Sequence, residues 1–301
     1  MSVRPSTPRS AASDPVARRR VQAWAVVFLA GLVLWAASTA TLVATGDDIV
    51  LPTVVISGSF LVPVTCIFWL LEHRRVTALT PERLLLAFFV AGVLGMIASA
   101  ALERWLLPSR TLPNLWVGLI EEAAKGVGLV LVARGLPRHL PRDGLILGAT
   151  VGLGFGAFES SGYALTYGFD NGEFSASSLL SEEILRAALA PFGHGIWTGL
   201  LGAAVFAAAR DGRLRLTIGV VGAYVGVALM HALWDASSTV GVVVAVAADG
   251  TAAEREAVRQ LDFPSPASVG PAWLYGTVQW TVMLAVAALG AAIYRRRWRA
   301  S

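Results

Sequence analysis

The sequence contains a single cysteine, a single lysine and few charged residues, which make up only 15% of its 301 residues. The lone cysteine, Cys66, excludes an intrachain disulfide and a metal site built from several cysteines. The low charge and a hydrophobic content of 55% exclude a soluble domain, because the uncharged runs reach the length of membrane-spanning helices. We find no internal repeat, which disfavours a transporter built from inverted repeats.

The apolar runs predict an all-α, polytopic bundle of about eight transmembrane helices, each near the length needed to cross the hydrocarbon. The predicted spans are Val21–Thr45, Val50–Leu71, Leu84–Ala101, Leu115–Ala133, Leu145–Thr166, Ile184–Ala209, Leu216 to about Val240, and Pro271–Tyr294. The seventh span is the least defined, and a break near Gly241 is an alternative to a continuous helix. We therefore expect one transmembrane domain over residues 21–294, with its core at 115–240. Residues 1–20 are expected to form a disordered basic tail, and residues 295–301 a basic tail.

The arginines orient this bundle with both termini in the cytoplasm, because basic residues concentrate in cytoplasmic loops. The predicted outer loops hold only Arg104, Arg110, Arg255 and Arg259, and the other loop and tail arginines fall inside. The net charge of +4 then reflects a cytoplasmic rim, so we expect no nucleic-acid partner. The lipid bilayer of the plasma membrane is the expected environment of a multi-pass protein.

The lysine, Lys125, lies inside an apolar stretch directly after the pair Glu121-Glu122. These ionisable side chains must be shielded from lipid, because each costs several kcal/mol there. Glu121 and Glu122 precede Lys125 by four and three residues, so both share a helix face with it. Lys125 can therefore neutralise one carboxylate while the other points about 100° around the helix.

Further polar residues fall at the same predicted depth on the next three spans. Glu159, His194, His231 and Asp235 all lie about 10 to 15 Å below the outer interface, as does the glutamate pair. His231 and Asp235 are also four residues apart and share a helix face. This agreement predicts one buried polar site that opens to the outer side.

Each element of this pattern also has a structural interpretation. The glutamate pair with Lys125 could be an ion-pair cluster that locks two helices, and His231 with Asp235 a packing hydrogen bond. Glu159 could be a buried acid bonded to a neighbouring hydroxyl, and His194 a satisfied interior histidine. Four such coincidences at one depth favour a functional site.

Neighbouring residues have predicted supporting roles. Arg186, at the outer start of the sixth span, is expected to snorkel to the surface or to support the site as an ion-pair partner. Gly152, Gly154 and Gly156 make the fifth span thin, which permits close approach of another helix or of a peptide. Phe155 and Gly156 are the expected substrate-access residues.

Four motifs together resemble those of the PrsW family of glutamic-type intramembrane proteases. They are Glu121-Glu122-x-x-Lys125, Phe155-x-x-x-Glu159, Arg186-Ala187-x-x-x-Pro191-x-x-His194, and His231-x-x-x-Asp235. That family is related to the CPBP proteases and to the type II CAAX prenyl endopeptidases. The resemblance covers roughly residues 20 to 245. It implies an endopeptidase that cleaves a single-span membrane protein, such as an anti-sigma factor, near the outer face.

The resemblance also implies roles for the residues. Glu121 would be the general base that activates water, and Glu122 would pair with Lys125. His231 and Asp235 would stabilise the developing oxyanion. Either Glu159 or His194 would be the second group that orients water.

The chain departs from the prenyl endopeptidases in ways that leave a metal open. Those enzymes have arginine, histidine and asparagine at the positions of Lys125, Glu159 and Asp235. The analogy favours an enzyme without a cofactor. The added carboxylates would nevertheless suit a divalent metal such as zinc, held by Glu121, Glu159, His194 and His231.

Two other classes of function remain open. A non-catalytic membrane scaffold of the same superfamily could retain buried histidines, although it would not need adjacent carboxylates. A proton-coupled transporter would need a polar pathway that reaches both faces. The inner halves of the four central helices are nearly free of charge, which favours a cavity that opens on one side.

Overall fold

A computed structural model describes residues 22–73, 77–107, 112–170 and 172–300. The predicted N-terminal tail, the predicted start at Val21 and Arg110 lie outside the described residues. The described chain is almost entirely helical. Its long helices are α1 (Ala23–Thr45), α2 (Leu51–His73), α4 (Gly92–Leu106), α5 (Pro113–Ala133), α6 (Pro141–Gly168), α7 (Ala176–Leu189), α8 (His194–Ala207), α9 (Ile218–Asp235), α10 (Ser237–Asp249) and α12 (Ala272–Ala300).

Shorter elements complete the described chain. The short helix α3 (Pro81–Leu85) continues through the π-helical η2 (Leu86–Ala91) into α4. The 3-10 turn η1 (Asp48–Val50) precedes α2, and η3 (Ala190–Phe192) joins α7 to α8. A two-residue hairpin, β1 (Phe169–Asp170) and β2 (Glu173–Phe174), follows α6. The helix α11 (Ala252–Arg259) and the turn η4 (Pro266–Ser268) lie between α10 and α12.

Local sequence signals set several of these boundaries. Thr80 caps α3 by accepting a hydrogen bond from the Arg83 amide, and Thr217 caps α9 in the same way. Thr251 and Glu254 form a reciprocal capping box at the start of α11. Capping side chains thus satisfy helix-end amides that would otherwise be unpaired.

Six stretches of the described chain are long and apolar enough to cross a membrane, so the protein is a multi-pass membrane protein. They are Ala23–Thr45, Asp48–His73, Pro81–Leu106, Ala176–Ala207, Ile218–Asp235 and Ala272–Ala300. The predicted count of eight also includes α5 and α6, which are 21 and 28 residues long. α5 falls outside the apolar set because it carries the glutamate pair and Lys125.

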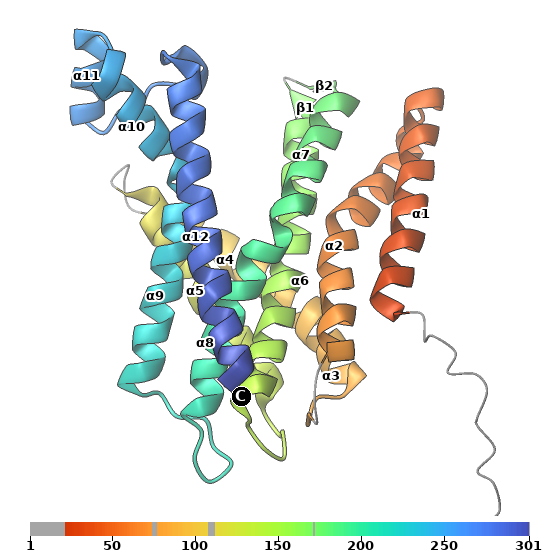
Figure 1. The fold of residues 1–301 in the computed structure, drawn as a ribbon. Helices are drawn as coiled ribbons and strands as arrows, with labels where there is room; N and C mark the ends of the chain where they lie inside the picture. Colours follow the sequence, from red (N-terminus) through yellow and green to blue (C-terminus); the bar gives the residue numbers. More distant parts are fainter. Residues whose placement is uncertain (1–21, 74–76, 108–111, 171, 301) are drawn as a thin grey trace, which may run out of the picture.

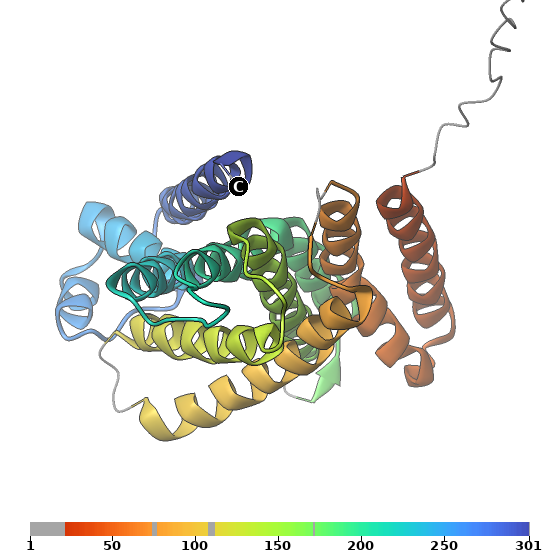
Figure 2. The same ribbon diagram turned by 90° about the horizontal axis from the view of Figure 1, so that it is seen from below.

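The helices form a bundle with α6 near its centre. α6 packs against α8 along much of its length, and also contacts α2, α4 and α7. Figure 1 shows the hairpin, α10 and α11 at one end of the bundle, and both ends of the described chain at the other. From that second end, α1 lies at one edge beside α2, and α12 lies outside α8 and α9 (Figure 2).

A seam of glycines joins α6 to α8. A Cβ atom added at Gly144, Gly148 or Gly152 would overlap the backbone carbonyl oxygens of Gly202, Thr198 and His194, respectively. Gly154 approaches the backbone of Phe88 on the opposite side of α6 in the same manner. The predicted thin helix is therefore confirmed, and its missing side chains allow two neighbouring elements to touch its backbone.

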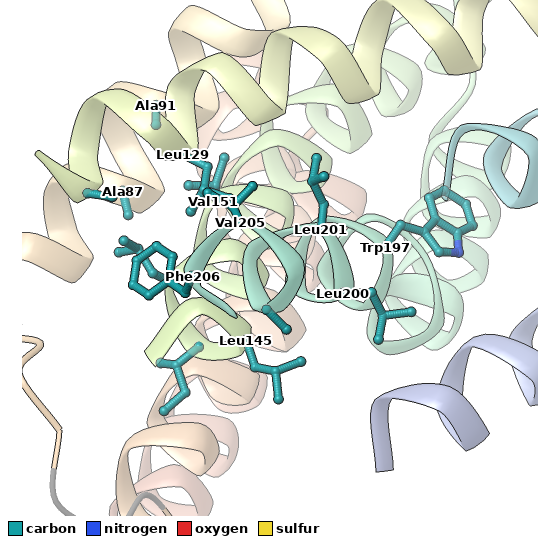
Figure 3. Packing of buried hydrophobic residues seen from close by; sticks show 14 of the residues in the cluster. Ala87, Ala91, Leu129, Leu145, Val151, Trp197, Leu200, Leu201, Val205 and Phe206 are labelled. Carbon is teal, nitrogen blue, oxygen red and sulfur yellow. The ribbon is translucent and has the colours of Figure 1, made fainter. Parts of the chain in front are cut away.

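The largest apolar core lies between α5, α6 and α8. Figure 3 shows Leu129, Val151, Leu201, Val205 and Phe206 packed together in this region. Leu129 follows Lys125 along α5, and Val151 precedes Glu159 along α6. Leu201, Val205 and Phe206 likewise follow His194 along α8. All five therefore lie between the polar residues and the end of the bundle where the described chain ends. The polar site therefore has a close-packed apolar floor.

Several predicted helix boundaries differ from the structure, most of all in the sixth and seventh spans. The sixth span begins at Ala176, not Ile184, and is interrupted by η3 because Pro191 lacks an amide hydrogen and cannot continue the α-helical pattern. The seventh helix ends at Asp235, so the expected extension to Val240 is wrong. The helix is interrupted at Ala236 and not near Gly241. Gly241 lies within α10, where its missing side chain lets the Tyr275 ring of α12 approach.

The last helix also differs from its predicted end. α12 continues to Ala300, beyond the expected boundary at Tyr294. The basic residues that the sequence interpretation assigned to a tail therefore lie on the last turns of this helix.

Candidate functional site

The glutamate pair and the lysine of α5 form the middle of the polar cluster. Lys125 is fully buried, and its Nζ lies 2.7 Å from Glu122 Oε1 and 3.2 Å from Glu121 Oε2. The Phe155 ring of α6 lies under the same ammonium, with 4.1 Å between Nζ and the ring centroid. The ion pairs follow from the spacing along the helix, but one cation contacts both carboxylates, where the sequence predicted that one of them would point away.

The two glutamates differ in access. Glu122 is completely buried and accepts hydrogen bonds from Thr198 of α8 at 3.4 Å and from His231 Nδ1 of α9 at 3.1 Å. Glu121 lines a cleft of about 270 Å³ between α4 and α6. A molecule that enters this cleft can meet Glu121, whereas Glu122 is enclosed by protein.

His231 connects the glutamate pair to Asp235. Its Nε2 lies 3.3 Å from Asp235 Oδ2, one turn along α9, and 3.7 Å from Glu121 Oε2. Its ring stacks on Trp197 of α8, with 4.7 Å between the centroids. Carboxylates thus face both ring nitrogens, and an indole holds the plane of the imidazole.

His194 stands where the chain resumes a helix after η3. Its Nδ1 lies 2.8 Å from Lys125 Nζ, and its Nε2 lies 3.1 Å from Glu159 Oε2. Because an ammonium only donates, Nδ1 must accept from Lys125, and Nε2 then carries the proton that is donated to Glu159. The ring centroids of His194 and His231 are 4.9 Å apart, so residues of α8 and α9 meet directly.

The orientation of Arg186 corrects one sequence interpretation. Arg186 does not snorkel to the surface: it donates to Glu159, and its Nε donates to Ser160 Oγ at 2.8 Å. Its guanidinium also lies 4.3 Å from the Tyr163 ring centroid. The physical reason is the packing of α7 against α6, which turns this face of α7 toward the Glu159 carboxylate. Arg186 is therefore an ion-pair partner, the other role considered for it.

The cleft and a smaller cavity border the cluster on two sides. The cleft between α4 and α6 is lined by Met96, Ser99, Ala100, Glu103, Glu121, Phe155, Glu159, Gly162, Tyr163 and Thr166. The smaller cavity, of about 70 Å³, includes Gly156, Arg186 and His194. Phe155 and Gly156 thus line different cavities, and Phe155 is itself buried.

Sequence reasoning did not assign any role to Ser99, Glu103 or Thr198. Glu103 lies two residues beyond the predicted end of the third span at Ala101, so its charge fell in the predicted outer loop. In the structure α4 continues to Leu106, which places Glu103 on the helix four residues after Ser99. Thr198 carried no signal in the sequence, because its contact with Glu122 depends on the packing of α5 and α8.

Comparison with known proteins assigns the family. The sequence model of the PrsW family intramembrane metalloproteases matches residues 80–252, more than half of the chain. This chain belongs to the PrsW family. The match contains all the predicted site residues but begins later than residue 20, where the sequence resemblance was placed, because α1 and α2 carry none of the motifs. Neither a curated protein nor a solved structure matches the chain.

The family description as a metalloprotease raises the question of which residues could hold an ion. In this PrsW-family chain, Glu121, His194 and His231 each offer a ligand atom, and these atoms lie within 4.8 Å of one another. One carboxylate with two imidazoles is a known ligand set of catalytic zinc, and a carboxylate behind each imidazole is typical of such sites. These donor types suit a divalent metal ion, and His194 Nδ1 would be free to bind one only after the Lys125 ammonium moved off that nitrogen.

The position of Glu159 differs from the predicted ligand set. This carboxylate is not part of the group formed by Glu121, His194 and His231. It accepts instead from Arg186 and His194 Nε2. Its place behind His194 suits a residue that orients an imidazole.

Proposed function

We propose that this PrsW-family protein is an intramembrane endopeptidase that hydrolyses a peptide bond of a single-span membrane protein near the outer face. The observation that carries the proposal is the convergence of Glu121, Glu159, His194 and His231, from four helices, beside one cleft. An anti-sigma factor is the proposed type of substrate, by the resemblance of the motifs. The proposed setting is the plasma membrane, with eight spans in residues 21–294 and both termini cytoplasmic.

Glu121 is the carboxylate that we place next to the attacked peptide. It lines the cleft, while its neighbour Glu122 is enclosed. In hydrolysis by water alone, Glu121 is placed to accept the proton from the attacking water. His231, 3.7 Å from Glu121 and backed by Asp235, is the proposed donor to the developing oxyanion.

The remaining charged groups hold the surroundings of Glu121 and His231 in place. Lys125 balances the charge of Glu122 and holds His194 through Nδ1. Arg186 fixes Glu159, which in turn orients His194 from the other side. Groups whose partners are already in place need little rearrangement during reaction, which is the basis of electrostatic preorganisation.

A bound metal ion would be held by Glu121, His231 and His194, the last through Nδ1 with the Lys125 ammonium turned away from it, and we favour this form because of the family description. The ion would supply Lewis-acid polarisation of the peptide carbonyl and activation of a water. Glu122 and Glu159, behind His231 and His194, would keep the two imidazoles oriented. The sequence interpretation favoured a metal-free base, and removal of the metal separates the two forms.

The packing below the site disfavours a proton-coupled transporter. Leu129, Val151, Leu201 and Val205 are buried and fill the space between α5, α6 and α8 on that side. A transporter needs a polar path that continues to the opposite face, and this floor is apolar. A scaffold would not need an accessible carboxylate in the cleft.

Replacement of one carboxylate tests the proposed protease. Glu121→Gln in purified protein, reconstituted with a single-span reporter, should abolish cleavage, because the amide can neither accept the proton nor serve as a strong ligand. The measurement is the appearance of the two reporter fragments. Glu256→Gln, on the exposed face of α11, is the matched control and should cleave like the parent. Equal cleavage by Glu121→Gln, with a parent-like melting temperature, would contradict the proposal.

A further inference from the structure

Helix α4 contributes two unpaired polar side chains to the cleft. Ser99 is only 2% exposed, and among the described residues its Oγ has no hydrogen-bond partner. Glu103 Oε1 is also buried without a partner within the described part of the chain. The two residues are four apart on one face of α4, and both line the cleft. Buried polar groups are ordinarily hydrogen-bonded, so these two unpaired oxygens indicate that a group of a bound ligand supplies the missing hydrogen bonds.

The charge of the cleft defines the kind of ligand group. The charged residues that line it are all acidic: Glu103, Glu121 and Glu159. The two nearby cations already have acidic partners, since Lys125 binds the glutamate pair and Arg186 binds Glu159. A cationic group would therefore be attracted to this wall, and an anionic group would be repelled.

We propose that Ser99 and Glu103 form a subsite for a basic side chain of the substrate, arginine or lysine. The inference rests on the proposed protease function and names a feature of its substrates. The ammonium or guanidinium would donate to the Glu103 carboxylate and to Ser99 Oγ. Both protein groups can accept, and the ligand supplies only donors.

Helix geometry places this subsite relative to the cleaved bond. Glu103 lies three residues before the end of α4, and Glu121 eight residues after the start of α5. Counted along each helix from the ends that the connecting loop joins, Glu103 is about 7.5 Å closer to its end than Glu121 is. This distance corresponds to about two residues of extended chain. The recognised basic residue should therefore lie about two positions to the outer side of the cleaved bond.

A basic residue at this depth is a selective feature. Charged side chains within the hydrocarbon are rare in single-span proteins, and basic residues concentrate on the cytoplasmic side. A protein with an arginine just inside the outer boundary thus differs from most others in the membrane. Only a substrate of this kind would find a partner for its charge in the cleft.

The test uses one single-span reporter with arginine, glutamine or glutamate at each of several positions outside the cut. The full chain in liposomes should cleave the arginine reporter about tenfold more efficiently than the glutamine one, because a charge-assisted hydrogen bond is gained. Glu103→Gln should bring the ratio of the two kcat/KM values close to one. Glu103→Arg should reverse the preference, so that the glutamate reporter is cleaved better than the arginine reporter.

The controls separate this inference from the function on which it rests. Glu173→Gln, on the exposed hairpin, should keep the parent ratio. A parent enzyme that cleaves all three reporters equally, or a Glu103→Gln variant that keeps the parent preference, would overturn the subsite but leave the protease. Failure of the parent to cleave any reporter would overturn both. Reversal by Glu103→Arg cannot arise from misfolding, which lowers all rates together.

Discussion

At the scale of single residues, Lys125 accounts for much of the geometry of the site. Its ammonium contacts Glu121, Glu122 and His194, and it is completely buried. Buried carboxylates are tolerated in a membrane only when paired, and removal of one partner of a buried pair costs about 3 to 5 kcal/mol. The lysine therefore makes the adjacent acids compatible with the bilayer and also orients an imidazole.

Removal of the metal distinguishes the two roles proposed for Glu121, which are those of a metal ligand and of a proton acceptor without a metal. We expect dialysis against 1,10-phenanthroline to abolish cleavage and zinc to restore it, since Glu121, His194 and His231 form the metal-compatible group. Bound zinc, measured by mass spectrometry, should be about one ion per chain, as in mononuclear catalytic sites. Glu159→Gln should weaken zinc binding about 10- to 100-fold, as expected for a residue behind a ligand.

His194→Gln provides the comparison for this experiment. It removes a proposed ligand and should reduce bound zinc more than Glu159→Gln does. Glu256→Gln, far from the cluster on α11, should bind zinc like the parent. Full cleavage after the protein is shown to be zinc-free would instead assign Glu121 the proton-accepting role without a metal.

The sequence predicted contacts within one helix better than contacts between helices. The spacing of Glu121 and Lys125 correctly predicted their ion pair, because helical periodicity alone determines it. The contact of Lys125 with His194, 69 positions away, depends on how α5 and α8 pack. The inward orientation of Arg186 depends in the same way on the packing of α7 against α6.

At the scale of elements, the glycine seam sets the distance between α6 and α8. The seam brings the backbones into contact at Gly148 and Gly152, and the residue that Gly152 meets is His194 itself, through its backbone carbonyl. A wider separation of the two helices would lengthen the hydrogen bond of 3.1 Å between the side chains of His194 and Glu159. The site therefore depends on residues that have no chemistry of their own.

A substitution in the seam tests this dependence. Gly148→Val should destabilise the protein by about 1 to 3 kcal/mol or more, because the new side chain would overlap the Thr198 backbone. Cleavage should fall as well, since the helices that carry Glu159 and His194 are forced apart. The measurements are the melting temperature in detergent and the reporter assay.

Gly222→Val is the matched control for this substitution. Gly222 is also inside a helix, α9, but a Cβ added there meets no atom within 4 Å among the described residues. It should melt close to the parent and retain cleavage. A Gly148→Val protein as stable and active as this control would show that the seam is not close-packed.

Helix boundaries show where sequence reasoning reaches its limit. Apolar run lengths located most of the long helices, but they merged α7 with α8 and did not separate α10 from α9. They did not reveal that α9 ends at Asp235, because α10 begins at Ser237 after an interruption of one residue and the apolar residues resume at Val240. The predicted sixth span likewise ran through Pro191 without a break, although proline cannot donate within a helix and the structure has the turn η3 there.

At the scale of the whole molecule, the question is whether α5 and α6 cross the membrane. Six stretches qualify by length and composition, and α5 and α6 lie inside the bundle beside them. Glu122, Lys125 and Glu159 of these two helices have charged or polar partners within the protein, which is how charged side chains are accommodated within a membrane. The bundle can thus contain two spans that hydropathy does not identify.

Cysteine labelling tests the proposed eight spans. Cys66 is the single native cysteine, so Cys66→Ser gives a background for one introduced thiol. Arg138→Cys lies in the loop between α5 and α6 and should react with an impermeant maleimide only after the cells are permeabilised. Glu173→Cys, after α6, should react from outside in intact cells.

The loop thiol gives opposite results for the two topologies. If α5 and α6 do not cross, the loop with Arg138 remains on the same side as Glu173, and both cysteines would be labelled in intact cells. The Cys66→Ser parent should show no labelling in either condition. External labelling of Arg138→Cys would therefore exclude the eight-span arrangement.

The contrast between the seam of α6 and α8 and the outlying α1 has a consequence for lipid dependence. Hydrophobic mismatch is relieved by helix tilt at modest cost. Only 6% of the apolar window of α1 is buried and its contacts are chiefly with α2, so α1 can tilt with less repacking than α6 and α8, which share a backbone contact and must tilt together. A thicker or thinner bilayer should therefore change the tilt of α1 first. The distances between the site residues on α6 and α8 should stay the same in membranes of different acyl-chain length.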